Sequence, residues 1–531
     1  MRANASVATS RFTPPRFAMS TPLDQAGPAI HDALSAPSVY GLRQWSGWVL
    51  GPLLLAFTLF APPPEGLSVE GWRTAGVALL LATFWISESI PIPATALLPL
   101  VLFPALGLAD MKAATAPYAN PIIFLFLGGF LIALAMQRWN LHRRVALGLI
   151  AAMGTRPKRI VAGFLLTSAL ISMWVSNTAT ALMMLPIALS VAELAPVESR
   201  DDPRQNAFAT ALLLAVAYGA TTGGMGTLIG TPPNALLAGY VEKVYGIQIG
   251  FGQWMLLGVP VVLVTIPVVY LVLTRVSFRL ADEPVAGMAE LMKTERARLG
   301  RLSRPEIAVA LVFALTALGW ITQPLLAKII PGVNDTLIAM AGALALFFIP
   351  VAPRRGLFVM DWTAAKNLPW DVLLLFGGGL SLAGLIERHG LSRYLGELCA
   401  GLDGFPVVLT LAVVCFGILM LTELTSNTAT AATFLPITAA LALSLGQNPL
   451  LFLIPTALAA NCSYMMPVGT PPNAIVFGSG RVPLPQMARA GMWLNVALVP
   501  ILLGMVLLLG GLAFDLNFDL VPDWATNAVS K

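Results

Sequence analysis

The feature that most constrains this chain is a succession of long stretches that carry almost no charge. Only 31 basic and 26 acidic residues occur among the 531, so 11% of the sequence is charged, against about 25% in a typical soluble domain. Hydrophobic residues make up 57% of the chain, and the mean hydropathy is +0.80. A soluble enzyme, a disordered scaffold and a nucleic-acid-binding protein are therefore poor interpretations. The composition predicts an all-α polytopic membrane protein.

Long apolar stretches mark the expected membrane spans, because a bilayer core of roughly 30 Å needs about 20 apolar residues per helix. Two regions, 160–193 and 405–446, are too long for one span and carry Ser-Asn-Thr at their centres, so each is either two crossings or a re-entrant hairpin. With both as hairpins, eleven spans remain, and those at 207–242 and 449–478 are interrupted by Gly-Thr-Pro-Pro-Asn. The other nine are expected at 46–61, 73–89, 91–108, 120–137, 253–274, 305–322, 335–352, 369–387 and 488–512.

The placement of charge predicts the orientation, since cytoplasmic loops of membrane proteins carry an excess of Lys and Arg. With eleven spans, the N-terminal tail, 1–45, lies on the same side as the Arg-rich segment 275–304, and the acidic C-terminal tail, 513–531, lies opposite. We therefore expect a cytoplasmic N-terminus and an extracytoplasmic C-terminus. Arg388 and Arg393 fall on the outer side as exceptions.

Two motifs occur twice, in the same order. Ser176–Thr180 recurs as Ser426–Thr430, displaced by 250 positions, and the shared register holds without a gap over about sixty residues. Gly230–Ala235 recurs as Gly469–Ala474, displaced by 239. Two copies of two motifs indicate an internal duplication, which a single Ser-Asn-Thr would not.

The duplication defines two repeats, at about 73–274 and 305–512, within one transporter domain at 46–512. An odd number of crossings separates the span 120–137 from its copy 369–387, so the repeats are predicted to have opposite orientations. Inverted repeats of this kind are typical of secondary transporters, which bind substrate and ions near the bilayer midplane where the repeats meet.

The duplicated motifs have the chemistry of a binding site. Ser, Asn and Thr are costly in hydrocarbon without hydrogen-bond partners, and single ones often only join helices. A helix that restarts at each hairpin tip presents unpaired N–H groups and its positive dipole end, which favours a ligand with two negative groups. Ser172 and Ser176, with Thr422 and Ser426 in the second copy, place oxygens on one helix face, where they suit a hard cation.

Two carboxylates lie in or beside the membrane region and are functional candidates by default. Glu423 precedes Asn427 by four residues, but its equivalent in the first repeat is Met173. A carboxylate that faced a dianion would repel it, so we expect Glu423 to hydrogen-bond the hairpin rather than to bind an ion. The sequence predicts no particular function for Glu88.

The paired motifs, together with Trp85–Pro99, resemble the divalent anion/sodium symporter (DASS) family of INDY-type dicarboxylate transporters over about residues 46–512. The resemblance implies sodium-coupled import of C4 dicarboxylates (succinate, malate, fumarate) by a homodimer in a bacterial inner membrane, through an elevator movement. Sodium ions would be co-transported. No organic cofactor, nucleic-acid partner or enzyme activity is expected.

The family pattern assigns residues to three sets. The substrate set is Ser176, Asn177, Thr178, Ser426, Asn427, Thr428, Thr470 and Pro471. The first sodium set is Ser172, Ser176, Asn177 and the Gly230 carbonyl, and the second is Thr422, Thr425, Asn427 and the Gly469 carbonyl. The family often has Ala at the position of Gly469, which is not expected to matter if only the carbonyl binds.

Three alternatives stay open on the sequence. A sodium-independent dicarboxylate exchanger could use the same fold, and sulfate or citrate could replace the C4 acid because neutral donors recognise negative groups and not the carbon skeleton. An ion channel would line its pore with the polar tips. A membrane enzyme is disfavoured because His31, His142 and His389 are scattered.

Overall fold

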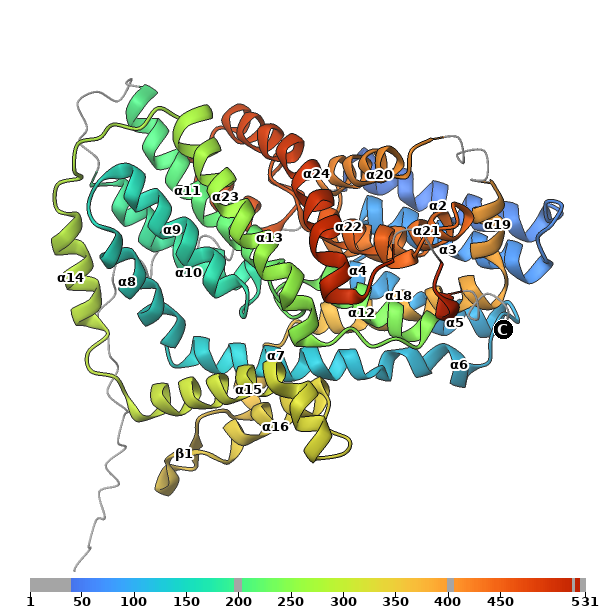
Figure 1. The fold of residues 1–531 in the computed structure, drawn as a ribbon, viewed down its shortest axis with the longest axis horizontal. Coiled ribbons are helices and arrows are strands. Elements are labelled where there is room, and N and C mark those ends of the chain that lie inside the picture. The colour runs from blue at the N-terminus through green and yellow to red at the C-terminus, as the bar shows by residue number, and fades with distance from the viewer. Residues whose placement is uncertain (1–39, 195–202, 399–404, 518–520, 526–531) are drawn as a thin grey trace, which may run out of the picture. The chain divides into compact units, whose positions relative to one another are not determined.

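The computed structural model describes residues 40–194, 203–398, 405–517 and 521–525. Most of the predicted N-terminal tail and part of the C-terminal tail therefore lie outside the described residues. The chain divides after Tyr40, and the helices and strands of the structure belong to the second unit, Gly41–Lys531. Figure 1 shows their order along the chain.

The first helices cover the beginning of the apolar region. Helix α2 spans Leu42–Phe60 and α3 spans Val69–Ser87. The predicted span 91–108 corresponds to one apolar stretch, Ile92–Ala105, which is divided into two short helices, α4 (Ile92–Thr95) and α5 (Leu98–Ala105). Each has proline in its first turn, where the missing N–H is tolerated but a preceding helix cannot continue. Short helices α6 (Met111–Thr115) and η1 (Ala116–Ala119) follow.

The internal duplication appears as one series of seven helices that occurs twice. The first series is α7 (Pro121–Arg138), α8 (Leu141–Met153), α9 (Pro157–Ser172), α10 (Asn177–Ala192), α11 (Pro203–Gly224), α12 (Pro232–Tyr245) and α13 (Phe251–Leu271), which η2 (Val272–Val276) extends. The second is α18 (Trp370–Arg388), α19 (Leu391–Leu398), α20 (Val407–Thr422), α21 (Asn427–Ser444), α22 (Pro449–Asn461), α23 (Pro471–Gly478) and α24 (Leu484–Phe514).

The two regions with Ser-Asn-Thr form helical hairpins, α9–α10 and α20–α21. Three of their four helices have 16 residues and the fourth has 18, which corresponds to about 24–27 Å. Each arm is thus shorter than the roughly 30 Å hydrocarbon core. This length favours re-entrant hairpins over two complete crossings each.

Six helices in the described part of the chain are long and apolar enough to cross a membrane, and several apolar helices are shorter. The all-helical polytopic architecture is thus confirmed, with one small exception. The predicted span 335–352 ends early, because α16 stops at Phe348 and Pro350–Ala352 forms strand β1, which pairs antiparallel with β2 (Leu357–Phe358). Pro350 and Pro353 each lack a backbone N–H and so disfavour continuation of the helix, and Gly356, with φ 63°, allows the turn.

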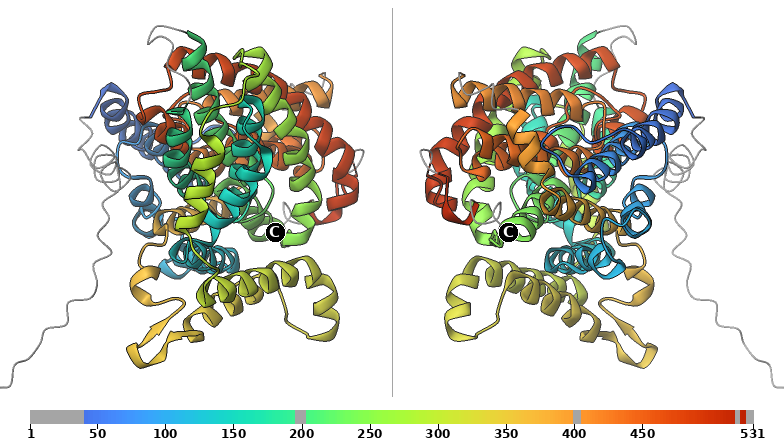
Figure 2. Two further views of the ribbon diagram at one scale, coloured as in Figure 1. Left: turned by 90° about the vertical axis from the view of Figure 1, so that its left-hand side faces the viewer. Right: turned by 90° about the vertical axis from the view of Figure 1, so that its right-hand side faces the viewer.

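The segment between the two series is tied to the first one. It contains α14 (Met288–Arg298), α15 (Arg304–Ile329), α16 (Asp335–Phe348), η3 (Pro353–Arg355) and α17 (Trp362–Ala365). Helices α15 and α16 pack along α7, below it in Figure 1 and in both views of Figure 2.

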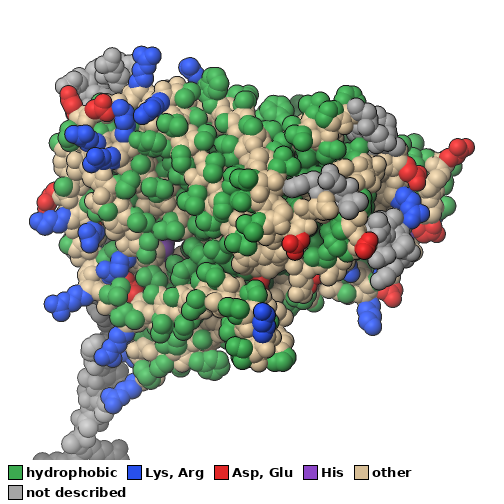
Figure 3. Space-filling view, viewed as in Figure 1, with side chains coloured by type: hydrophobic (Ala, Val, Ile, Leu, Met, Phe, Trp, Pro, Cys, Tyr) green, Lys and Arg blue, Asp and Glu red, His purple; other side chains and the backbone are tan. Residues whose placement is uncertain are grey.

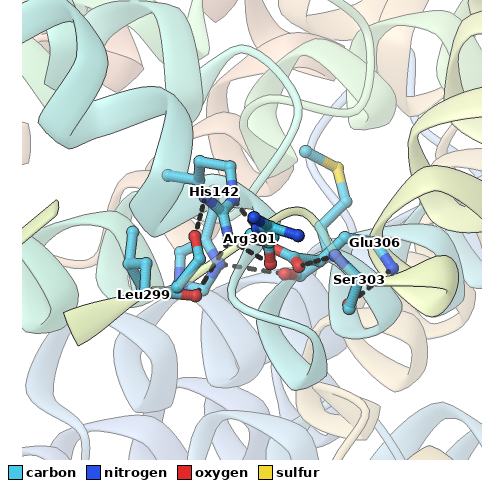
Figure 4. Close-up of polar contacts among 8 residues, drawn as sticks. His142, Leu299, Arg301, Ser303 and Glu306 are labelled. Atoms are coloured by element: carbon cyan, nitrogen blue, oxygen red, sulfur yellow. Dashed lines mark hydrogen bonds and ion pairs between the residues drawn. The ribbon is translucent and has the colours of Figure 1, made fainter. Parts of the chain in front are cut away.

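Arginine 144 on α8 fixes the connection between α14 and α15. Its guanidinium donates to the Glu306 carboxylate at 2.8 Å and to the backbone carbonyls of Leu299 and Gly300 at 3.0 Å each. Glu306 also accepts from the backbone N–H of Ser303 at 2.7 Å, which caps α15 (Figure 4). The Arg144–Glu306 pair therefore provides hydrogen-bond partners for backbone carbonyls just after α14 and for a backbone N–H group at the start of α15.

Candidate substrate and cation site

Four helices begin at the duplicated motifs. Helices α10 and α21 begin at Asn177 and Asn427, each directly after the serine of its Ser-Asn-Thr motif. Helices α12 and α23 begin at Pro232 and Pro471, each directly after the threonine of its Gly-Thr-Pro-Pro-Asn motif. The predicted breaks therefore lie at the motifs, and each break produces the N-terminal end of a helix.

The first hairpin tip brings together most of the first sodium set. With its amide nitrogen turned toward them, Asn177 donates to the Ser172 hydroxyl at 2.5 Å, the Ala220 carbonyl at 3.1 Å and the Gly230 carbonyl at 3.3 Å. Ser172 is fully buried. The Ser176 hydroxyl accepts from the backbone N–H of Ala179 at 3.3 Å and so caps α10.

The second hairpin tip repeats this arrangement with different residue types. The Thr422 hydroxyl donates to the Asn427 side-chain oxygen at 2.8 Å and to the Ala460 carbonyl at 2.7 Å. The Asn427 amide nitrogen donates to the backbone carbonyl of Asn461 at 3.2 Å. The Thr425 hydroxyl is engaged by other partners, the Leu421 carbonyl at 3.0 Å and the Thr430 hydroxyl at 2.6 Å.

Gly469 lies directly against the second hairpin. A Cβ at this position would lie 2.9 Å from the Thr422 carbonyl and 1.9 Å from the Ser463 hydroxyl. In this chain, alanine at position 469 would therefore require the Ser463 side chain and the backbone near Thr422 to move, whereas the prediction that only the Gly469 carbonyl binds sodium stays untested. Gly230 is equally constrained, since its Cβ would meet the Gly224 carbonyl at 2.4 Å.

The asparagine of each Gly-Thr-Pro-Pro-Asn motif shapes the loop that breaks the helix. Asn234 donates to the carbonyls of Gly224 at 3.2 Å and Thr227 at 2.8 Å. Asn473 donates to the carbonyls of Ser463 and Met466, the equivalent residues under the 239-residue displacement, at 3.2 and 3.1 Å. Both asparagines are fully buried. This structural role was not foreseen from the sequence, although the duplication of the asparagine was visible.

Asn461, which lies outside the duplicated motifs, connects the two hairpin tips. Its amide nitrogen donates to the Thr221 carbonyl at 2.9 Å, and its backbone carbonyl accepts from Asn427. Ala220, the residue before Thr221, accepts from Asn177. The two tip asparagines are thus joined through two successive backbone carbonyls of α11 and one residue of α22. Asn461 is a polar residue at the end of an apolar helix, just before the break, and this position in the sequence could have indicated a role at the site.

Further hydrogen bonds join the two broken helices near this point. The Thr231 hydroxyl donates to the Asn461 side-chain oxygen at 2.6 Å. The Tyr218 hydroxyl donates to the Tyr464 carbonyl at 2.7 Å, and the Thr222 and Tyr464 hydroxyls lie 2.9 Å apart. These buried contacts hold segments more than 200 residues apart in one polar network.

Glu423 is buried, with 3% of its surface exposed. Its carboxylate accepts from the backbone N–H groups of Tyr464, Met465 and Met466 at 2.8–3.0 Å and from the Asn495 amide at 2.7 Å. The expected hydrogen-bonding role is therefore present, but the expected partner was wrong: the carboxylate holds the loop between α22 and α23, and not its own hairpin. Three successive N–H groups that point at one anion form a strong binding nest.

The remaining substrate candidates lie at the same helix starts. Thr428 is buried in the first turn of α21, and Thr178 is half-buried in the first turn of α10. Thr470, which is 3% exposed, precedes α23, and Pro471 is its exposed first residue.

Comparison with known proteins identifies the class of this molecule as a membrane transporter. A family described as "Sodium:sulfate symporter transmembrane region" matches residues 43–513. The chain belongs to this family, which confirms the resemblance inferred from the motifs and places the protein among transporters and not enzymes.

Two curated relatives are sodium-dependent dicarboxylate transporters named SdcS. The protein from Staphylococcus saprophyticus is 43% identical over 465 residues, which cover 86% of this chain and 89% of the relative. The protein from Staphylococcus aureus strain MRSA252 is 42% identical over 487 residues, covering 90% and 94%.

Two solved structures share the fold at low sequence identity. MtrF of Neisseria gonorrhoeae, described as an antimetabolite efflux pump, is 13% identical with a TM-score of 0.53, covering 88% of this chain and 95% of MtrF. The YdaH transporter of Alcanivorax borkumensis is 16% identical with a TM-score of 0.51, covering 91% and 100%.

Proposed function

We propose that this protein is a sodium-coupled symporter that imports C4 dicarboxylates such as succinate, malate and fumarate. The observation that carries the proposal is the connection between the two tip asparagines, Asn177 and Asn427, through α11 and Asn461. It unites two helix N-termini and two sets of neutral oxygens in one polar region. The relatives named sodium-dependent dicarboxylate transporters support the choice of substrate and ion.

The substrate is bound by neutral donors. The hydroxyls and amides of Ser176, Asn177, Thr178, Ser426, Asn427, Thr428 and Thr470, with Pro471 beside them, contact the two carboxylates, and the starts of α10 and α21 add their dipoles. Because these donors carry no full positive charge, the co-transported cations offset the charge of the dianion.

Each cation binds between one hairpin and one broken helix. The first site uses Ser172, Ser176, Asn177 and the Gly230 carbonyl, and the second uses Thr422, Thr425, Asn427 and the Gly469 carbonyl. At the first site, the Asn177 amide nitrogen donates to the same oxygens that a cation would bind. Sodium binding therefore includes a rotation of this amide that presents its oxygen instead.

The transporter domain, 46–512, contains two inverted repeats and works by an elevator movement of the two hairpins and broken helices. Lys and Arg side chains gather along the left edge of Figure 3, over α8 and α14, and this edge faces the cytoplasm of a bacterial inner membrane. The N-terminal tail, 1–45, is then cytoplasmic and the C-terminal tail, 513–531, extracytoplasmic. The functional unit is a homodimer.

Uptake into proteoliposomes tests the coupling. We expect an inward sodium gradient to drive accumulation of radiolabelled succinate, and replacement of sodium by choline on both sides to abolish it. Uptake that is unchanged in choline would reject symport. Uptake only into vesicles preloaded with a dicarboxylate would identify an exchanger, and non-saturable flux would identify a channel.

A competition panel tests the substrate class. Unlabelled succinate, malate and fumarate should inhibit uptake of labelled succinate, whereas sulfate and citrate should compete weakly. Sulfate belongs in this panel because the description of the family names it. Stronger inhibition by sulfate or citrate than by succinate would assign the site to that anion.

A further inference from the structure

An arginine at the start of the described chain contacts the tip of the second hairpin. Arg43, on α2, donates through Nη1 to the backbone carbonyl of Leu424 at 3.1 Å. Its Nη2 lies 3.0 Å from the carboxylate of Glu88. Leu424 lies in the bend between α20 and α21, two residues before Ser426. One guanidinium therefore joins α2 and α3 to the segment that carries half of the proposed substrate site.

Arg43 and Glu88 belong to two closely packed helices: Arg43 lies in the first turn of α2, and Glu88 caps the end of α3. A Cβ at Gly47 would lie 2.0 Å from the Ser87 hydroxyl and 2.1 Å from the Ser89 hydroxyl, so only glycine permits this approach of α2 to α3. The Ser89 hydroxyl also donates to the Gln44 carbonyl at 2.8 Å. Glu88 ends α3 in the left-handed conformation, with φ 52°. This strained position directs its carboxylate at Arg43.

The contact between Arg43 and the hairpin tip is weak enough to form and break during a conformational change. The side chains of Arg43 and Glu88 are each 37% exposed, and partly exposed ion pairs are weak compared with buried ones that are well paired. The tip of the first hairpin is held differently: Trp174, the equivalent of Leu424, packs on the rings of Phe251 and Phe313 with centroids 6.1 and 5.0 Å away.

We propose that Arg43, oriented by Glu88, is a latch that holds the tip of the second hairpin against α2 and α3 and must release when the hairpin moves. Arg43 and Glu88 are positioning residues: they act on the hairpin tip through the Leu424 carbonyl and contact neither the substrate nor a proposed cation ligand. The role in transport rests on the function proposed above, whereas the contact itself does not.

Cysteine accessibility measures the latch directly. Leu424→Cys keeps the backbone carbonyl and places a thiol at a side chain that is 57% exposed, whereas Cys415 and Cys462 are buried. Cys399 lies outside the described residues and is replaced by serine in every sample. In purified protein without substrate, Arg43→Ala should raise the rate of maleimide modification about threefold to tenfold, because a hydrogen bond to a charged group at a partly exposed site is lost.

Three further variants make the result specific. Glu88→Gln should raise the rate by less than Arg43→Ala, and Arg43→Lys should partly restore the original rate because it keeps the charge. Arg73→Ala, which removes another arginine that bonds a carbonyl, that of Leu106 at 3.5 Å, should change nothing. An unchanged rate in both Arg43→Ala and Glu88→Gln, in protein that remains folded by its thermal unfolding, would overturn the latch. If Arg43→Ala does not fold, Glu88→Gln and Arg43→Lys decide.

Transport kinetics separate a latch from a general structural role. Release of the hairpin should change the maximal rate of uptake in Arg43→Ala several-fold and leave the half-saturating sodium concentration unchanged, since no proposed cation ligand is touched. Equal changes in both parameters would contradict the latch. The modification experiment needs no transported substrate, so it still applies if succinate is not the substrate.

Discussion

The backbone N–H groups of the loop that breaks a helix donate to the loop's own carbonyls in the first repeat and to a carboxylate in the second. In the first, the N–H groups of Met225 and Gly226 donate to the carbonyls of Thr222 and Gly223 at 3.2 and 2.9 Å. In the second, the N–H groups of Tyr464, Met465 and Met466 donate to Glu423. The motifs on either side of both loops are nevertheless the same.

This difference teaches that duplication preserves the groups that face the site more strictly than the groups that support them. The tip asparagines, the motif glycines and the motif asparagines occupy equivalent places in both repeats. The contacts that hold these groups in place differ between the repeats, because any set of contacts that fixes the same backbone conformation can do so. The two halves of the site should therefore respond alike to changes in the motifs and unequally to changes behind them.

The largest expected effect comes from removing the carboxylate. Glu423→Ala leaves the buried N–H group of Tyr464, the part-buried N–H groups of Met465 and Met466, and the buried Asn495 amide without their acceptor, at about 1–3 kcal/mol for each fully buried group. We expect a large fall in the melting temperature and loss of uptake. Met173→Ala, at the equivalent position, is the matched control: Met173 is half-buried beside Gly226 and its side chain accepts no hydrogen bond from the loop.

Thermal unfolding in detergent and succinate uptake measure both variants. Equal destabilisation by Glu423→Ala and Met173→Ala would show that the two loops do not differ in their support. Glu423→Gln refines the test, since it retains one acceptor oxygen but turns an NH₂ group toward N–H donors. It should fall between the wild type and Glu423→Ala.

The next largest effect is on transport alone. Asn177→Ala and Asn427→Ala should each abolish uptake while protein continues to reach the membrane, because each removes a proposed ligand of both substrate and cation. Immunoblotting of membranes and succinate uptake are the two measurements. Normal uptake in both variants would refute the site assignment. Loss in only one would show that the repeats contribute unequally to binding as well as to support.

Much of the fold could be predicted because strong local signals mark it. Proline removes a backbone donor and Ser, Asn and Thr favour helix starts, so the starts of α10, α12, α21 and α23 were correctly predicted at the duplicated motifs. The turn after α16 was missed, since a run of apolar residues does not distinguish the end of a helix from a short strand.

Long-range partners were the part that the sequence could not supply. Glu423 was a visible candidate, but its acceptance of N–H groups some 40 residues away depends on packing that has no local pattern. The same holds for Arg43, which contacts Leu424 across 381 positions, and for Asn461, whose role depends on α11 and α21 meeting beside it. Backbone carbonyls or N–H groups are partners in all three cases, and because every residue type carries a carbonyl and every type except proline an N–H, the sequence does not mark them.

The smallest expected effect tests how the hairpin tips are held. Trp174→Leu installs the residue of the second repeat at the tip of the first and removes the ring contacts with Phe251 and Phe313, worth about 0.5–1.5 kcal/mol beyond the buried area. We expect the melting temperature to fall by about 1–3 °C and uptake to continue. Leu424→Ala is the matched control and should have no effect on stability, since its exposed side chain leaves the carbonyl that Arg43 binds in place. If Leu424→Ala destabilises the protein as much as Trp174→Leu, the second tip is also held by its side chain, and the contrast between aromatic packing at one tip and a backbone hydrogen bond at the other is wrong.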